Sequence, residues 1–147
     1  MNPFPHILVP IDFEASANDA LEVAMELAQT FGAKLTLLHV WEIPVYPYME
    51  FMIDSQAIAG VQDRAVAMLA AKLEQVRQSL PNAESKLETG LAWSGILKAV
   101  DDLRPNLIVM GTHGRRGLSH ALLGSVAEKV VRLSPIPVLT VRPKNVS

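Results

Sequence analysis

Four glycines lie between residues 111 and 124, in a segment that also contains Arg115 and Arg116. Glycine lets backbone amides approach a ligand closely and adopts positive φ without strain. The two arginines add local positive charge and donors for charge-assisted hydrogen bonds. Residues of these types at this spacing are suited to binding an anion, and a phosphate group above all.

The glycine segment ends in Ser125-Val126-Ala127-Glu128, which has the form of a capping box. We expect Ser125 to be the N-cap of a helix, with unpaired amides directly behind it that attract anions. Each residue alone also fits a simpler interpretation, in which the glycines shape a tight connection and Ser125 only caps the helix. Their combination favours a phosphate site.

The spacing excludes two common nucleotide motifs. No G-x-x-x-x-G-K-[ST] is present, so no lysine is fixed against the phosphates as in P-loop enzymes. Pro10-Ile11-Asp12-Phe13 stands where a dinucleotide fold carries G-x-G-x-x-G. Asp12 is suited to a hydrogen bond with a base or ribose, or to holding Mg²⁺, and alternatively orders the turn before Ser16.

The histidines indicate no metal site. His113 lies in the glycine segment, where phosphate contact and simple solvation are equally good interpretations. His6, His39 and His120 are scattered, and we interpret them as structural. The absence of cysteine excludes disulfides, thiolate metal sites and cysteine nucleophiles.

Short apolar runs alternate with segments of helical periodicity, which is typical of parallel strands joined by crossover helices. We expect strands at 7–11, 35–40, 84–91, 106–110 and 136–141, and helices at 16–31, 58–80, 94–104 and 125–133. Continuous Val, Ile and Leu runs predict an α/β fold in which helices cover both faces of a five-stranded parallel sheet. The charged strand at 84–91 belongs at an edge, and ligands bind at the carboxyl ends of such strands.

Length and charge narrow the class of protein. The 147 residues are expected to form one domain, 1–147. A net charge of -2 produces no long-range electrostatic field that would attract nucleic acid or anionic lipid, so neither partner is expected. No secretory signal pattern and no long apolar run occur, and we expect a soluble, cytoplasmic protein.

The aromatic, proline-containing segment 41–52 is interpreted as a covering loop, over the sheet edge or against a second subunit.

Gly111, Gly114, Gly124 and Ser125 together match G-x2-G-x9-G-[ST]. This motif and the flanking runs 7–12, 107–114 and 137–142 resemble the universal stress protein family, in particular its ATP-binding members. The resemblance implies a three-layer open sheet of strand order 3-2-1-4-5. It also implies ATP across the carboxyl ends of the first and fourth strands, with ADP or AMP as alternatives and Mg²⁺ as a companion.

The resemblance further implies the contacts of the nucleotide. Adenine and ribose would be surrounded by Pro10, Ile11, Asp12 and Val40. The triphosphate side corresponds to Met110, Gly111, Gly114, Gly124, Ser125 and Val126, and we add Thr112, His113 and Arg115 from the glycine segment.

The last strand, 138–141, is apolar and lies at an edge in this strand order. Family members often dimerise through this strand, so we expect a homodimer, with cover by the tail 143–147 as the alternative.

The glycine segment contains no lysine, and no base is paired with a nucleophile. We therefore interpret the chain as an ATP-binding regulatory protein of the stress response with little or no turnover, no catalytic residue and no indicated downstream partner. One alternative is a slow Mg²⁺-dependent ATPase, in which Asp12 orients water and an arginine stabilises the γ-phosphate. The other is a ligand-free interaction module that uses the aromatic loop and the edge strand.

Overall fold

The structure, a computed structural model, describes residues 2–13, 15–42, 55–112 and 123–144. Nine elements follow one another in these ranges: β1 (His6–Pro10), α1 (Ala15–Phe31), β2 (Lys34–Trp41), α2 (Ser55–Arg77), β3 (Glu84–Thr89), α3 (Ala92–Leu103), β4 (Leu107–Gly111), α4 (Ser125–Leu133) and β5 (Val138–Val141). The predicted alternation of strands and helices is therefore confirmed, with most boundaries moved by one to three residues.

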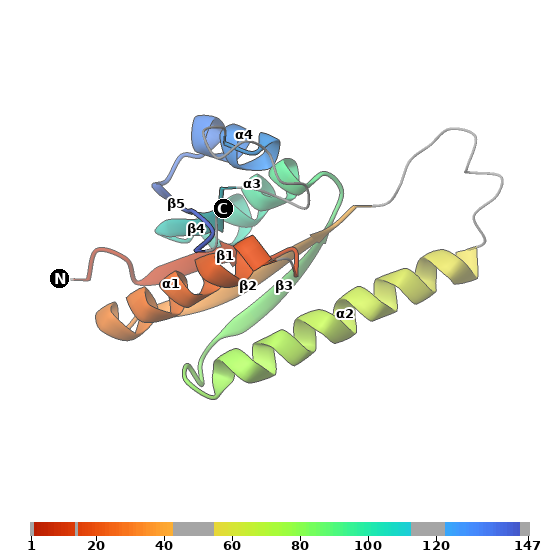
Figure 1. The fold of residues 1–147 in the computed structure, drawn as a ribbon, viewed down its shortest axis with the longest axis horizontal. Coiled ribbons are helices and arrows are strands. Elements are labelled where there is room, and N and C mark those ends of the chain that lie inside the picture. Colours follow the sequence, from red (N-terminus) through yellow and green to blue (C-terminus); the bar gives the residue numbers. More distant parts are fainter. Residues whose placement is uncertain (1, 14, 43–54, 113–122, 145–147) are drawn as a thin grey trace.

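The five strands form one parallel sheet of order β3-β2-β1-β4-β5, as expected (Figure 1). β1 pairs with β2 on one side and with β4 on the other, while β3 and β5 are the two edges. Because all strands are parallel, their carboxyl ends meet at one end of the sheet. The residues that follow β1, β2 and β4 are consequently neighbours in space.

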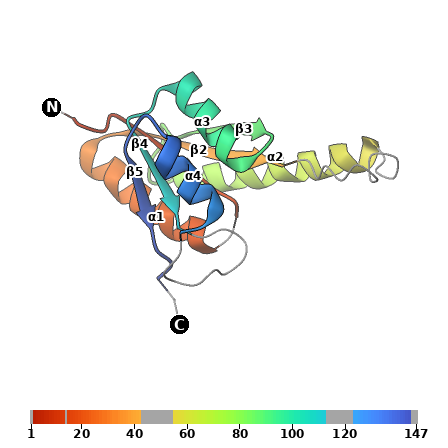
Figure 2. The same ribbon diagram turned by 90° about the horizontal axis from the view of Figure 1, so that it is seen from above.

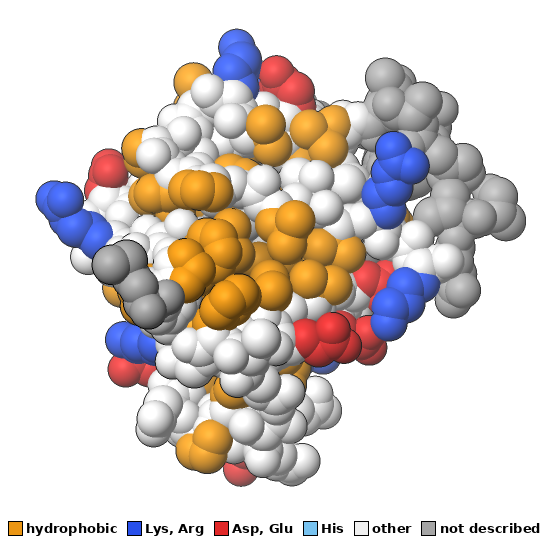
Figure 3. Space-filling model, turned by 90° about the vertical axis from the view of Figure 1, so that its left-hand side faces the viewer, with side chains coloured by type: hydrophobic (Ala, Val, Ile, Leu, Met, Phe, Trp, Pro, Cys, Tyr) orange, Lys and Arg blue, Asp and Glu red, His pale blue; other side chains and the backbone are white. Residues whose placement is uncertain are grey.

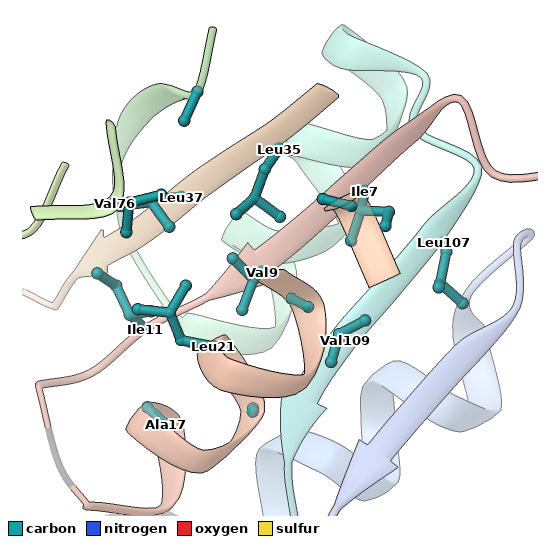
Figure 4. Close-up of a cluster of buried hydrophobic side chains, with 14 of the residues drawn as sticks. Ile7, Val9, Ile11, Ala17, Leu21, Leu35, Leu37, Val76, Leu107 and Val109 are labelled. Atoms are coloured by element: carbon teal, nitrogen blue, oxygen red, sulfur yellow. The ribbon is translucent and has the colours of Figure 1, made fainter. Parts of the chain in front are cut away.

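Helices cover both faces of the sheet (Figures 1 and 2). Alternate residues of β1 point to opposite faces, which divides the buried side chains into two clusters. Figure 4 shows the cluster between the sheet and α1 and α2, with Ile7, Val9, Ile11, Ala17, Leu21, Leu35, Leu37, Val76, Leu107 and Val109. The cluster beneath α3 and α4 consists of Leu8, Leu38, Ile96, Ala99, Val100, Ile108, Met110, Ala127 and Val130.

Two helices end where the backbone enters the left-handed region. Gly32 after α1 has φ 64°, a conformation that glycine adopts without steric cost. Arg104 after α3 has φ 51° and donates its amide to the Val100 carbonyl. α2 ends at Arg77, earlier than the predicted residue 80, because the next amide, Gln78, bonds to a carbonyl three residues back in a tighter turn.

The edge strand β3 carries the predicted charges in an ion-pair cluster. The Glu88 side chain is buried, and its two oxygens lie 3.1 Å from Lys98 Nζ and 3.3 Å from Lys86 Nζ. Burial raises the pKa of Glu88, but the two ammonium groups outweigh burial and hold this pKa below its ordinary value. A strand edge with paired charges disfavours further strand addition at β3.

Apolar side chains gather on the side of the molecule that Figure 3 shows. Where β1 begins, the rings of Phe4 and Phe31 meet edge to face, with 5.8 Å between their centroids. None of the helices in the described ranges is both long and apolar enough to cross a membrane.

We expect His6, the first residue of β1, to make stability depend on pH. Its Nε2 lies 2.8 Å from Thr36 Oγ1, and burial, followed by the nearby Lys34, lowers its pKa below the ordinary value of 6.5, while Glu84 opposes the shift. The unfolded chain therefore takes up the proton more readily, and stability falls as pH drops through about 6.5. His6→Gln should reduce the loss of urea midpoint between pH 7 and pH 5. An unchanged loss would contradict this role for His6.

Candidate functional site

The candidate site lies at the carboxyl ends of β1 and β4. β1 pairs with β2 over all five of its residues, from His6 to Pro10. With β4 it pairs only at Ile7 and Leu8 within the described residues, so the two strands are not paired toward their carboxyl ends. The strand order also reverses here: β2 and β3 lie on one side of β1, and β4 and β5 lie on the other. In open α/β sheets this is the position at which ligands bind.

The first turn of α4 is fixed to the end of β4 by a backbone hydrogen bond. The Gly124 amide donates to the Thr112 carbonyl at 2.7 Å, and the Thr112 amide donates to the Val141 carbonyl of β5 at 3.1 Å. Thr112 is itself buried. The start of α4 therefore has a defined place beside the strand ends.

Gly124, not Ser125, is the N-cap of α4, so the predicted capping box is wrong. The Gly124 carbonyl accepts the first helical hydrogen bond, from the Glu128 amide at 2.8 Å, which makes Ser125 the first helical residue. Gly124 has no side chain with which to cap the helix. The amides of Ser125, Val126 and Ala127 precede Glu128 and consequently have no partner within the helix.

The residues predicted on the phosphate side differ in exposure. Gly124 is buried and Ser125 is exposed, while Gly111, the last residue of β4, is half-buried. The side chains of Met110 and Val126 pack in the cluster beneath α3 and α4. These two residues can therefore offer a ligand their backbone groups rather than their side chains.

On the β1 side, Pro10 ends the strand and the chain then turns. The Ile11 amide donates to the Leu38 carbonyl at 2.8 Å, which continues the contact between β1 and β2 by one residue. Asp12 is half-buried, and Phe13 has φ 66°. The carboxylate predicted to meet the ribose, base or Mg²⁺ thus stands at the bend itself.

Val40, near the end of β2, is held in place by α3. A Cβ atom added to Gly95 would lie 2.7 Å and 2.8 Å from the two methyl carbons of Val40. Real Cβ atoms essentially never approach another atom so closely, so glycine at 95 is required for α3 to reach Val40.

Two helix N-termini at this end of the sheet differ in their capping. At α3, the Ala92 amide donates to Glu42 Oε1 at 2.8 Å, so a carboxylate that follows β2 already lies at this helix N-terminus. At α4, the N-cap residue supplies no side-chain hydrogen bond. An anion is consequently better suited to α4 than to α3.

Several predicted residues lie outside the described ranges: Gly114, His113, Arg115 and most of the aromatic segment 41–52. Trp41 is described, and it is the buried last residue of β2 rather than part of a loop. Within the described ranges, no three His, Asp or Glu side chains are grouped in a way that could hold a metal ion.

Sequence reasoning missed two residues that shape this end of the sheet, Gly95 and His39. The role of Gly95 is not predictable from the sequence, because a glycine inside a helical segment does not indicate which side chain packs against it. His39 did have a signal, since it directly precedes Val40 at the end of a strand, yet we interpreted it only as structural.

Comparison with known proteins agrees with this architecture. A family model described as "Universal stress protein family" matches residues 3–142. A universal stress protein of Thermus aquaticus is 34% identical over 139 residues, which cover 95% of this chain and 99% of that protein. The solved structure of UspA from Lactobacillus plantarum is 26% identical, with a TM-score of 0.79 over 95% of this chain and 98% of the other.

Two further solved structures share the fold and hold nucleotides. An Arabidopsis thaliana family protein with AMP bound is 20% identical, with a TM-score of 0.66 over 95% of this chain and 92% of its own. A universal stress protein in complex with cAMP is 21% identical, with a TM-score of 0.66 over 96% and 98%. At these identities the likeness shows the fold alone.

We expect Gly95→Ala to destabilise the protein by about 1 to 3 kcal/mol, because the new methyl group overpacks against Val40. Gly60→Ala is the matched control, since Gly60 lies in α2 with open space around it, and alanine there should stabilise by about 0.5 to 1 kcal/mol. Urea unfolding measures both. Adding Val40→Ala should recover part of the loss in Gly95→Ala, and strict additivity of the two changes would contradict the contact.

Proposed function

Because the chain belongs to the universal stress protein family, we propose that it is a regulatory protein that binds an adenine nucleotide, ATP, at the carboxyl ends of β1 and β4. Occupancy of this site changes the conformation or partners of the protein, with little or no turnover. The observation that carries the proposal is the start of α4, whose first amides have no partner within the helix and which Thr112 holds beside β4.

The triphosphate is assigned to this start of α4. Three successive amides at a helix N-terminus offer donors and the positive end of the helix dipole to an anion. A hydrogen bond to a charged group contributes about 1.5 to 3 kcal/mol. A micromolar complex requires about 8 kcal/mol, so a few such bonds together with burial of adenine are sufficient. The phosphate-side contacts in this proposal are Met110, Gly111, Thr112, His113, Gly114, Arg115, Gly124, Ser125 and Val126.

Adenine and ribose are assigned to the β1 and β2 side, with Pro10, Ile11, Asp12 and Val40. The half-buried Val40 supplies apolar surface, the buried Ile11 can offer only its backbone, and the Asp12 carboxylate is suited to a ribose hydroxyl or a base amine. Mg²⁺ is commonly held by one or two carboxylates together with phosphate oxygens. Asp12 fits that requirement, and Mg²⁺ would then neutralise charge on the bound triphosphate.

The two nucleotide-bound fold relatives support an adenine nucleotide as the ligand class. They hold AMP and cAMP rather than ATP. ADP and AMP are therefore the alternatives to ATP at this site.

Little turnover is proposed because the glycine segment offers no fixed lysine against the phosphates. Fast phosphoryl transfer normally uses a fixed lysine and a residue that orients water. Residues 111–126 contain no lysine. Two lysines on nearby helices have other contacts, Lys98 with Glu88 and Lys129 over the Trp93 ring at 5.0 Å.

The proposal includes a homodimer formed through β5, a single domain over 1–147 and a cytoplasmic location. The dimer is supported by the apolar edge at β5, where Leu139 is exposed, and by the exposed Val131 and Leu133 of α4. The single domain is supported by the family match over 3–142.

Gly124→Asp tests the phosphate site. Gly124 has φ -61° and ψ 158°, which any residue adopts, and aspartate is a favoured N-cap, so α4 should persist. Its carboxylate would stand beside the phosphate and repel it, and since juxtaposed like charges cost several kcal/mol we expect affinity for ATP to fall by about 100-fold or more.

Gly124→Asn is the matched control, because asparagine has the same size and caps equally well but carries no charge. It should lose much less affinity than Gly124→Asp. Calorimetric titration with ATP, together with mass spectrometry of nucleotide released from the freshly purified, denatured protein, provides the measurements. Equal ATP affinity of the wild type and Gly124→Asp would exclude this site.

Turnover separates a regulatory protein from an enzyme. We expect the purified protein with ATP and Mg²⁺ to hydrolyse well below about 1 ATP per second, the lower end of ordinary enzyme rates. Phosphate release measured over many equivalents decides the matter. Sustained hydrolysis above that rate would replace the regulatory proposal with an ATPase.

A further inference from the structure

We infer that His39 is a positioning residue for the adenine and ribose side of the nucleotide site. It acts through the main chain of Ile11 to Phe13, without touching the nucleotide. The inference rests on the proposed function and deepens it, since it assigns to one buried side chain the task of holding Asp12 in place.

His39 is connected directly to the backbone of the turn after β1. Its ring is buried, and Nδ1 lies 2.9 Å from the Ile11 carbonyl oxygen. A carbonyl oxygen can only accept a hydrogen bond, so Nδ1 must carry the hydrogen. In the neutral ring the hydrogen therefore resides on Nδ1, and Nε2 keeps a lone pair.

Ile11 is held by β2 at both of its backbone groups. Its amide donates to the Leu38 carbonyl at 2.8 Å, and its carbonyl accepts from His39 at 2.9 Å. Consecutive residues of β2 thus fix both peptide groups of Ile11, the residue directly before Asp12. This leaves the Asp12 peptide little freedom on its N-terminal side.

Phe13 fixes the other side of Asp12. Its φ of 66° lies in the left-handed region, which is uncommon for a bulky aromatic residue and persists only where surrounding contacts enforce it. The Phe13 ring packs against the His39 ring, with 4.7 Å between the centroids and 51° between the planes. The same imidazole therefore contacts the residues on both sides of Asp12.

A comparison with His6 separates positioning from simple burial. His6 lies at the opposite end of β1 and bonds to a side chain, Thr36 Oγ1. His39 bonds to the main chain at the end of β1 where the candidate site lies. If burial alone explained these histidines, loss of either would affect stability and neither would affect one half of a ligand selectively.

The inference predicts an effect confined to the nucleoside half of the ligand. Loss of the Nδ1 donor should weaken ATP and adenosine by the same factor, about tenfold for one lost hydrogen bond. Inorganic tripolyphosphate, which contacts only the α4 side, should bind as before. A general loss of fold would weaken all three ligands together.

Three variants of the full chain test this effect by displacement of a fluorescent ATP analogue. His39→Phe keeps a ring beside Phe13 and removes the donor, and it should show the tenfold loss for ATP and adenosine only. His39→Asn places its amide NH₂ near the position of Nδ1, and it should bind within about threefold of the wild type. His6→Phe is the control at the other end of the sheet and should leave all three affinities unchanged.

Nitrogen NMR of the ¹⁵N-histidine-labelled wild type provides a measurement that does not depend on any variant folding. The nucleotide-free protein should show the Nδ1-protonated form of His39, and a ring protonated only at Nε2 would overturn the inference. The inference would also be overturned if His39→Phe bound ATP and adenosine as tightly as the wild type does. Failure of His39→Asn to bind them more tightly than His39→Phe would overturn it as well. If the wild type binds ATP, these failures leave the proposed function intact. If the wild type binds no adenine nucleotide, the proposed function is lost and the inference with it.

Discussion

The parallel pairing of β1 with both β2 and β4 is the constraint on which the rest of the structure depends. It buries β1 on both faces and brings the ends of the central strands together. Main-chain groups beyond the last paired residues then need other partners, because buried polar groups without partners are costly. Here these partners are the Leu38 carbonyl of β2, the Val141 carbonyl of β5, the His39 side chain and the start of α4.

The two sides of the candidate site are held by different means. At β4, backbone bonds link the Thr112 peptide to Gly124 and to Val141. At β1, a side chain from the neighbouring strand holds the Ile11 carbonyl and packs against Phe13. A backbone link imposes few demands on residue type, whereas the second arrangement depends on a side chain that carries a hydrogen-bond donor at this position. The β1 side is therefore the more sensitive to substitution.

Nucleotide binding and fast hydrolysis require different interactions with the phosphate groups. Helix amides and glycines hold a phosphate in its ground state with little strain, and such contacts alone do not lower the barrier to transfer. Acceleration needs a fixed charge, commonly a lysine, against the transition state and a residue that orients water. The glycine segment contains arginines but no lysine. The role proposed for the nucleotide is therefore regulatory, with little or no turnover.

The sequence by itself determined the alternation of elements, the edge position of β3 and the glycine spacing, because burial and backbone freedom are recorded in local residue patterns. The helix 125–133 is predicted correctly from the sequence, whereas its N-cap residue is not. Only the tertiary structure shows that Gly124 is the N-cap of α4, that Val40 packs closely against Gly95 and that His39 hydrogen-bonds to the Ile11 carbonyl. His39 and Ile11 are 28 residues apart, and Gly95 and Val40 lie on different elements. Contacts of this kind depend on where the chain returns in space, which no local pattern encodes.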